Sequence, residues 1–242
     1  MKETKPLIHN KFFNQSIRTL VSIFIKTFYR LEVHHRERIP LQGGILLVAN
    51  HVSYVDALII QHIFPRPIRF MSFSGFFQTP ILGSILKSFH CIPVSPSGAK
   101  EAMREVVKSV ANGEVVCIFP EGELTTSGEL HDFKKGIEIM IRKIEGRAKV
   151  LPLYLDDLWG SIFSYYGGYA FWKLPQSLPR RISVIFGLAN SRATLTAQDL
   201  KQEIIQLRKE TKTYRQRNKS PQMISISTSS TTSAIRSDTS II

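Results

Sequence analysis

The feature that most restricts the fold of this chain is an alternation, from Gly44 onward, between short apolar runs and longer amphipathic segments. Short apolar runs are typical of buried strands, and apolar residues at helical spacing are typical of helices packed on one face. Strands that alternate with helices predict an α/β fold, a single domain with a mostly parallel central sheet flanked by helices. The expected strands are 45–49, 68–73, 92–95, 115–119, 149–155 and 181–186. The expected helices are 53–63, 97–111, 133–145 and 196–217.

A further amphipathic helix is expected near the start of the sequence, from Lys11 to Leu31. Its large apolar residues recur at helical spacing, beside a basic stripe of Arg18, Lys26 and Arg30. This pattern is typical of a helix in a membrane interface, and equally of a surface helix packed on a domain core. We therefore divide the chain into an amphipathic membrane-interface helix (1–31), a globular domain (32–217) and a Ser/Thr-rich tail expected to be disordered (218–242).

The balance of charges predicts an anionic partner. The chain has 32 Lys and Arg residues against 19 Asp and Glu, a formal net charge of +13. This excess suits an anionic membrane surface, nucleic acid or an acidic protein, but no helix-turn-helix, zinc or RNP-type pattern supports nucleic acid. The two cysteines cannot form a disulfide framework or a zinc cluster, which favours a reducing compartment. We expect no secretory signal, because Met1–Asn10 lacks an apolar core, and no spanning helix, because Lys11–Leu31 carries too many charges.

The first candidate site is the run Asn50-His51-Val52-Ser53-Tyr54-Val55-Asp56, which follows an expected strand and opens an expected helix. Ligands and catalytic groups gather at the carboxyl ends of strands in α/β folds. With His51 in the loop and Asp56 in the first helical turn, the carboxylate can fold back onto the imidazole. It would fix the tautomer and make the ring a general base for a hydroxyl. The alternative is that Asp56 only completes a capping box with Ser53, and that His51 is an ordinary loop residue.

The second candidate site is Phe119-Pro120-Glu121-Gly122, which also follows an expected strand. Gly122 permits unusual backbone angles and the close approach of a ligand. Glu121, Thr125 and Thr126 offer hydrogen-bonding groups. The alternative interpretation of this run is an ordinary turn between a strand and a helix.

Together, the NHxSxxD run and the later FPEG run resemble the HxxxxD glycerolipid acyltransferases, the 1-acylglycerol-3-phosphate acyltransferase superfamily. The resemblance covers roughly Arg30 to Ala189, because 133–136 (FKKG) and 150–153 (VLPL) look like further blocks of that family. It implies an α/β acyltransferase domain on a membrane, which moves a fatty acyl group from an acyl thioester to a glycerolipid hydroxyl. It also implies that His51 is the catalytic base, that Asp56 orients it, and that the FPEG block helps to bind the phosphate-bearing acceptor.

Within that family, the run FPEGELTTSG is most similar to the 2-acylglycerophosphoethanolamine acyltransferases, whose acyltransferase domain is fused to an acyl-carrier-protein synthetase. The usual lysophosphatidate enzymes carry an arginine where this chain has Leu124. Other cations are therefore expected to meet the acceptor phosphate, and the candidates are Lys134, Lys135, Lys100 and Arg104. The predicted substrate-binding residues are Glu121, Gly122, Thr125, Lys134 and Lys135, and no metal ligand is predicted.

The sequence thus predicts an O-acyltransferase that acts on a lysophospholipid, with acylglycerophosphoethanolamine as the favoured acceptor and lysophosphatidate as the alternative. The expected donor is a thioester of acyl carrier protein or coenzyme A, with no cofactor, and a separate acyl-ACP synthetase would supply the acylated carrier. We expect the protein on the cytoplasmic face of a membrane. The alternatives are a non-catalytic basic membrane-binding protein and an inactive relative of the family.

Overall fold

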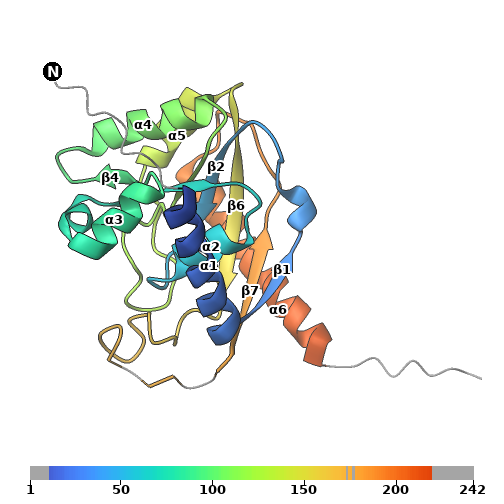
Figure 1. Ribbon diagram of the computed structural model, residues 1–242. Coiled ribbons are helices and arrows are strands. Elements are labelled where there is room, and N and C mark those ends of the chain that lie inside the picture. Colours follow the sequence, from blue (N-terminus) through green and yellow to red (C-terminus); the bar gives the residue numbers. More distant parts are fainter. Residues whose placement is uncertain (1–10, 173, 176–177, 220–242) are drawn as a thin grey trace, which may run out of the picture.

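The computed structural model describes residues 11–172, 174–175 and 178–219, which form one sheet with helices on both of its faces (Figure 1). The strands are β1 (Tyr29–His34), β2 (Gly44–Ala49), β3 (Ile68–Phe73), β4 (Ile92–Val94), β5 (Val115–Ile118), β6 (Ala148–Asp156) and β7 (Arg180–Phe186). The helices are α1 (Lys11–Phe28), α2 (Asp56–Ile63), α3 (Pro80–Ser88), α4 (Ala99–Ala111), α5 (Gly136–Ile144) and α6 (Ala197–Lys219), with the 3-10 helices η1 (Arg36–Arg38) and η2 (Ser74–Gln78).

The sheet has the order β1-β7-β6-β2-β5-β3-β4. Neighbouring strands are parallel except for β6 and β7, which pair antiparallel. The expected α/β fold with a mostly parallel sheet is confirmed. The two site motifs follow β2 and β5, and these strands are direct neighbours in the sheet. Both motifs therefore emerge side by side at the carboxyl ends of two parallel strands.

The central strand β2 shows how the sequence pattern builds the core. All six of its residues are buried, as expected for a strand covered on both faces. Because side chains alternate along a strand, Ile45 and Leu47 face the helices α1 and α2. Leu46 and Val48 face the opposite layer, which is formed by α4, α5 and α6. One apolar run thus contributes to two separate hydrophobic layers.

The helices α2 and α5 begin three residues later than the sequence pattern predicts. The residues before α2 form a turn instead, in which the Asp56 N–H donates to the Ser53 carbonyl at 3.2 Å. Before α5, the Lys134 N–H donates to the Pro120 carbonyl at 2.9 Å. In both places a backbone N–H group is hydrogen-bonded to a carbonyl of a site loop. The helix therefore does not extend further toward its amino terminus.

The amino-terminal helix is shorter than expected. It ends at Phe28, because Tyr29–His34 forms β1 and pairs in parallel with β7. The predicted continuation of the helix to Leu31 is wrong, since pairing at the sheet edge outweighs the helical spacing of the apolar residues. Arg30 lies in β1, so the basic stripe predicted on the helix is shorter as well. The side chain of Arg18 lies outside the described part of the chain.

Helix α1 packs one face on the domain and leaves apolar residues uncovered. Ile25 is buried, and Val21 and Phe24 pack on the same core. Leu20 and Ile23, in contrast, are 66% and 57% exposed. Among the described residues, no helix combines the length and the apolar character that crossing a membrane requires.

Helix α6 continues to Lys219, two residues beyond the end expected at Arg217, so the tail does not begin at 218. The remainder of the tail, 220–242, and the first ten residues, 1–10, lie outside the described part of the chain. The expected disorder of the tail stays a prediction.

Candidate active site

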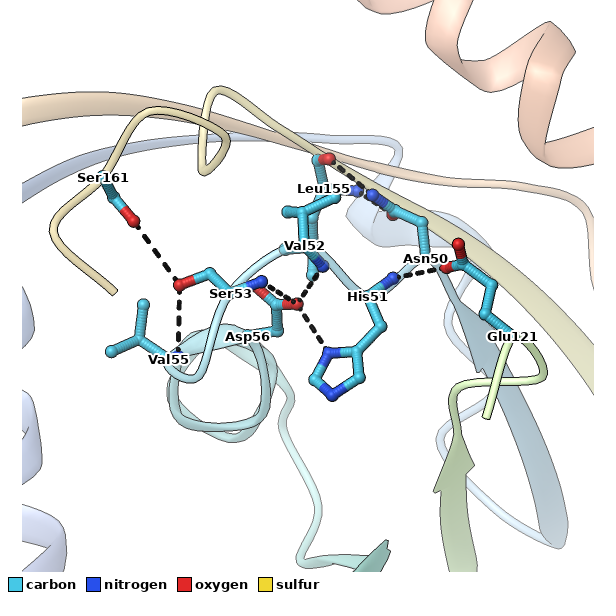
Figure 2. A network of polar contacts seen from close by, with 9 residues as sticks. All are labelled: Asn50, His51, Val52, Ser53, Val55, Asp56, Glu121, Leu155 and Ser161. Atoms are coloured by element: carbon cyan, nitrogen blue, oxygen red, sulfur yellow. Dashed lines mark hydrogen bonds and ion pairs between the residues drawn. The ribbon is translucent and has the colours of Figure 1, made fainter. Parts of the chain in front are cut away.

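His51, in the loop that follows β2, contacts Asp56, the first residue of α2 (Figure 2). His51 Nδ1 lies 2.8 Å from Asp56 Oδ2. The same carboxylate oxygen accepts the backbone N–H groups of Val52 at 2.7 Å and Ser53 at 2.9 Å. The Asp56 side chain is fully buried, so these contacts hold it in one position. The capping interpretation is partly right, because Asp56 bonds the Ser53 N–H, but the same carboxylate also meets the imidazole.

The second ring nitrogen of His51, Nε2, lies on the side of the ring away from Asp56 (Figure 2). An Nδ1–H that is donated to a carboxylate leaves Nε2 as the proton acceptor. His51 lines a cavity of about 1500 Å³. The imidazole is thus arranged to accept a proton from a group held in this cavity.

The cavity is large and mostly apolar. Its wall includes residues from α1, α2, α3, α4, α5 and β3, and its large apolar side chains include Phe70, Leu86, Phe89, Met103 and Met140. The volume exceeds the roughly 300–1,000 Å³ of ordinary small-molecule pockets. The cavity therefore has the size and the lining to hold a hydrocarbon chain with its polar end near His51.

Glu121, in the loop after β5, supports the His51 loop from behind. Its Oε1 accepts the His51 backbone N–H at 2.7 Å, and its Oε2 accepts the His131 backbone N–H at 2.9 Å. The side chain is almost fully buried, and this burial raises the pKa of the carboxyl above its ordinary value. Glu121 is not part of the cavity wall. The structure thus assigns the Glu121 carboxylate to two backbone N–H groups, and its predicted contact with substrate stays a prediction.

Thr125 has a similar supporting position. Its N–H donates to the His51 carbonyl at 3.1 Å, and its Oγ1 accepts the Gly128 N–H at 3.0 Å. Thr125 is fully buried and lies outside the cavity wall, and its predicted contact with substrate stays a prediction. Lys135 is exposed and does not line the cavity either.

Gly122 and Lys134 do line the cavity, and they contact one another. Gly122 has a φ of +78°, and a Cβ at this position would lie 2.7 Å from Lys134 Nζ. The missing side chain therefore makes room for the lysine amine. Neither Lys100 nor Arg104 lines the cavity, and Arg104 pairs with Glu101 at 3.1 Å. Of the four predicted phosphate cations, the structure brings Lys134 to the cavity.

Two residues of the motifs have roles that the sequence analysis did not assign. The ring of Phe119 stacks on the His51 imidazole, with centroids 3.9 Å apart and an interplanar angle of 11°. The side chain of Asn50 donates to the Leu155 carbonyl at 3.0 Å and accepts the Leu155 N–H at 2.8 Å (Figure 2). A polar residue that ends a buried strand needs such partners, and that requirement could have identified Asn50.

The two thiols are not arranged as nucleophiles. Burial raises the pKa of Cys91, and it raises the pKa of Cys117, which lies inside β5, well above its ordinary value. A thiol in such surroundings stays protonated and inert at neutral pH. The His51 imidazole, paired with Asp56, is accordingly the group in this cavity that is best placed for proton transfer from a hydroxyl.

Comparison with known proteins gives a consistent result. The profile of the protein family described as Acyltransferase matches residues 30–156, a segment that contains both site motifs. The chain is 28% identical over 124 residues to 1-acyl-sn-glycerol-3-phosphate acyltransferase of Bacillus subtilis, a match that covers 50% of this chain and 60% of that protein. It is 25% identical over 155 residues to the chloroplastic 1-acyl-sn-glycerol-3-phosphate acyltransferase LPAT1 of Arabidopsis thaliana, covering 59% of this chain and 43% of that protein. The chain thus spans about half the length of these two relatives.

A solved structure supports the fold. The crystal structure of the 1-acyl-sn-glycerophosphate (LPA) acyltransferase PlsC from Thermotoga maritima matches with a TM-score of 0.62, covering 85% of this chain and 84% of that chain. The sequence identity in this alignment is 18%. The two chains therefore share the arrangement of the sheet and its helices.

Proposed function

The chain belongs to the Acyltransferase family, whose profile covers more than half of it, and from this premise we propose that it transfers a fatty acyl group from an acyl thioester to the hydroxyl of a lysoglycerophospholipid. The observation that carries the proposal is the 2.8 Å contact between His51 Nδ1 and Asp56 Oδ2 at the wall of an apolar cavity. This contact supplies a base for the hydroxyl, and the cavity supplies room for a hydrocarbon chain.

The proposed reaction is a direct transfer. His51 Nε2 takes the proton of the acceptor hydroxyl as the hydroxyl oxygen attacks the thioester carbonyl carbon. Asp56 stabilises the imidazolium that forms. The C–S bond then breaks, the thiolate leaves, and the proton on Nε2 returns to the sulfur. The reaction needs no bound cofactor, because the acyl thioester is itself the co-substrate.

Two observations bear on the acceptor head group. Leu124 lines the cavity at the position where the lysophosphatidate enzymes carry an arginine. A phosphodiester carries less negative charge than a phosphomonoester, so Lys134 would meet it without a second cation. This favours acylglycerophosphoethanolamine as the acceptor. Lysophosphatidate is the second candidate, because similar proteins are named 1-acyl-sn-glycerol-3-phosphate acyltransferases.

We further propose that the protein works at the cytoplasmic face of a membrane, with α1 as one point of attachment. Leu20 and Ile23 leave apolar surface exposed on this helix, and Lys26 lies at the cavity wall. The net charge of +13 favours an anionic lipid surface. The donor would be acyl carrier protein or coenzyme A carrying the acyl group, and a separate acyl-ACP synthetase would load the carrier protein.

The proposal is tested with purified protein, a long-chain acyl thioester of either carrier, and two acceptors offered separately. The acceptors are acylglycerophosphoethanolamine and lysophosphatidate, with thiol release and product mass as the two measurements. We expect acceptor-dependent thiol release that the His51→Ala variant lacks. Thiol release that never exceeds that of His51→Ala, in a protein that still binds vesicles, would instead favour a non-catalytic membrane-binding protein.

A further inference from the structure

A compact loop between β6 and β7 presents aromatic rings to solvent. The loop runs from Ile162 to Phe171, and its ends are joined by a hydrogen bond of 2.7 Å from the Phe171 N–H to the Ile162 carbonyl. Such closed loops are well-ordered surface units. Tyr169 is 80% exposed, and Trp172, which directly follows the closure, is 88% exposed. In Figure 1 this segment lies at the lower left, beyond the end of the sheet.

Other rings of the loop contact the rest of the domain. Phe163 contacts Phe24 of α1, with centroids 6.0 Å apart, and Phe171 at 5.4 Å. Phe171 also contacts Tyr54, at 5.6 Å, and the Tyr54 and Tyr165 hydroxyls are 2.8 Å apart. Tyr169 therefore lies on, and Trp172 directly after, a loop that is packed against α1 and against the segment between His51 and Asp56.

The base of the loop is also part of the cavity mouth. Tyr54 and Tyr165 line the cavity, and so do Ile23 and Lys26 of α1. Ile23 is 57% exposed and Tyr54 is 40% exposed, so the cavity wall continues into open apolar surface here. The aromatic loop, through Tyr165, and α1, through Ile23, thus both adjoin the partly exposed wall of the His51 cavity.

We propose that Tyr169 and Trp172 insert into the headgroup region of a phospholipid bilayer and hold the cavity mouth against it. Tyr and Trp have an apolar ring and a polar end, which suits them to the interface between lipid and water. The net charge of +13 favours a lipid surface over an apolar protein partner, because anionic lipids satisfy both the rings and the charge. The inference rests on the proposed function, since an acceptor with a hydrocarbon chain must leave a bilayer to enter the cavity.

The first test uses the tryptophans, of which the chain has two. Trp159→Phe leaves Trp172 as the sole emitter, and the fluorescence is recorded with vesicles of phosphatidylcholine and phosphatidylglycerol. We expect a blue shift and strong quenching by lipids brominated on the acyl chain. Trp172→Phe is the matched control, because the Trp159 ring packs over Gly128 and Tyr166 and should not respond. Unchanged Trp172 emission with protein sedimented on the vesicles, or no sedimentation at all, would overturn the proposal.

The second test measures vesicle binding of the double variant Tyr169→Ser and Trp172→Ser. We expect binding to weaken by about tenfold or more, given the apolar area of two aromatic rings. Leu41→Ser is the control. Leu41 is 75% exposed, but it precedes β2 and therefore lies at the amino-terminal end of the strands, opposite the site. Equal binding of the double variant and the control would contradict the proposal.

Activity measurements separate this inference from the proposed function. The double variant should keep the wild-type rate toward a short-chain lysolipid dissolved as monomers and lose rate toward the same head group presented in vesicles. Equal loss in both formats would show that the loop acts on the cavity itself and would overturn the membrane role. A wild-type chain that is inactive in both formats but shows the Trp172 blue shift would contradict the proposed function while leaving the membrane contact supported.

Discussion

The backbone N–H of His51 donates to Glu121 Oε1 at 2.7 Å, across 70 residues of sequence. This bond joins the loop after β2 to the loop after β5. Phe119, from the second loop, also stacks on the His51 ring. The FPEG run therefore fixes the position of the imidazole from two directions: its aromatic ring stacks on the imidazole, and its carboxylate holds the backbone of the first motif.

Glu121→Gln should lower the free energy of unfolding by about 1–3 kcal/mol. The amide has one acceptor oxygen, so one of the two backbone N–H groups would face an NH₂ group and lose its partner. Activity should fall as well, because the His51 loop is no longer held. Urea unfolding and kinetics check this, and Glu123→Gln, an exposed neighbour that lines the cavity, is the control for stability alone. Equal stability of the two variants would contradict the supporting role of Glu121.

The pH dependence of the same variant gives a further check. Burial raises the pKa of Glu121 in the folded state, so the folded protein binds this proton more tightly than the unfolded chain. The contribution of Glu121 to stability is therefore fully present below its unfolded pKa and is lost as the pH rises through the raised folded value. The Glu121→Gln variant should not show this loss of stability as the pH rises. A difference curve of unfolding free energy between the two proteins that slopes in the opposite direction would show that the pKa is lowered.

Gly122→Ala should impair use of the acceptor, because a Cβ at this position displaces the Lys134 amine. Gly113→Ala is a matched control, since both glycines have a positive φ but no atom lies within 4 Å of a Cβ at Gly113. Both variants should lose comparable stability from the backbone conformation. Only Gly122→Ala should raise the KM for the acceptor. A KM that rises equally in both variants would attribute the effect to the backbone alone.

Lys134→Met should lower kcat/KM for phosphate-bearing acceptors by roughly ten- to hundredfold, which corresponds to the loss of a charge-assisted hydrogen bond. Lys135→Met is the neighbouring control, because Lys135 is exposed and does not line the cavity. The difference between the two variants should disappear with monoacylglycerol, which has no phosphate. If Lys135→Met is impaired as strongly as Lys134→Met, the effect is one of general surface charge.

Substitutions at two neighbouring positions of α1 should separate the role of this helix in packing from its role in membrane binding. Ile25 is buried, so Ile25→Ala should destabilise the protein by about 2–5 kcal/mol. Ile23 is largely exposed, so Ile23→Ala should change stability by less than about 0.5 kcal/mol. Ile23→Ala should instead weaken binding to anionic vesicles. This binding is measured under conditions in which both variants are folded. Wild-type vesicle binding by Ile23→Ala would remove α1 from the proposed membrane contact.

The two neighbouring strands β2 and β5 could be predicted closely because they are buried on both faces. The predicted run 45–49 lacks only the first residue of β2, and 115–119 extends one residue beyond β5. In these strands an unbroken apolar run is required by burial alone, so the local sequence contains the information.

Two elements could not be predicted in this way. β1 has the sequence YRLEVH, with polar residues at the sheet edge, and it exists because it pairs with β7, some 150 residues later. No local pattern contains that partner. Helix α3 is nine residues long and contains Gly83, and a short apolar run of this kind does not distinguish a helix from a strand.

The site was predictable to a similar extent. The contact between His51 and Asp56 follows from their short separation in sequence around the start of a helix. In the structure, His51 Nδ1 lies 2.8 Å from Asp56 Oδ2. The catalytic role of the pair stays a prediction. The positions of Glu121 and Thr125 depend on which backbone N–H and carbonyl groups lie behind the loop. Sequence alone identifies a carboxylate and a hydroxyl but not whether they face a ligand or the protein's own backbone.

The most direct test of the proposed mechanism is a double-variant comparison of His51 and Asp56. Acyl transfer is measured for His51→Ala, Asp56→Asn and the variant with both changes, with melting curves to confirm that each is folded. General-base assistance contributes about 10²–10⁴-fold, so each single variant should lose most of the rate. Because the two residues act as one unit, the double variant should be scarcely slower than His51→Ala. A folded His51→Ala that keeps near wild-type, lysolipid-dependent transfer, or losses that multiply in the double variant, would contradict the account.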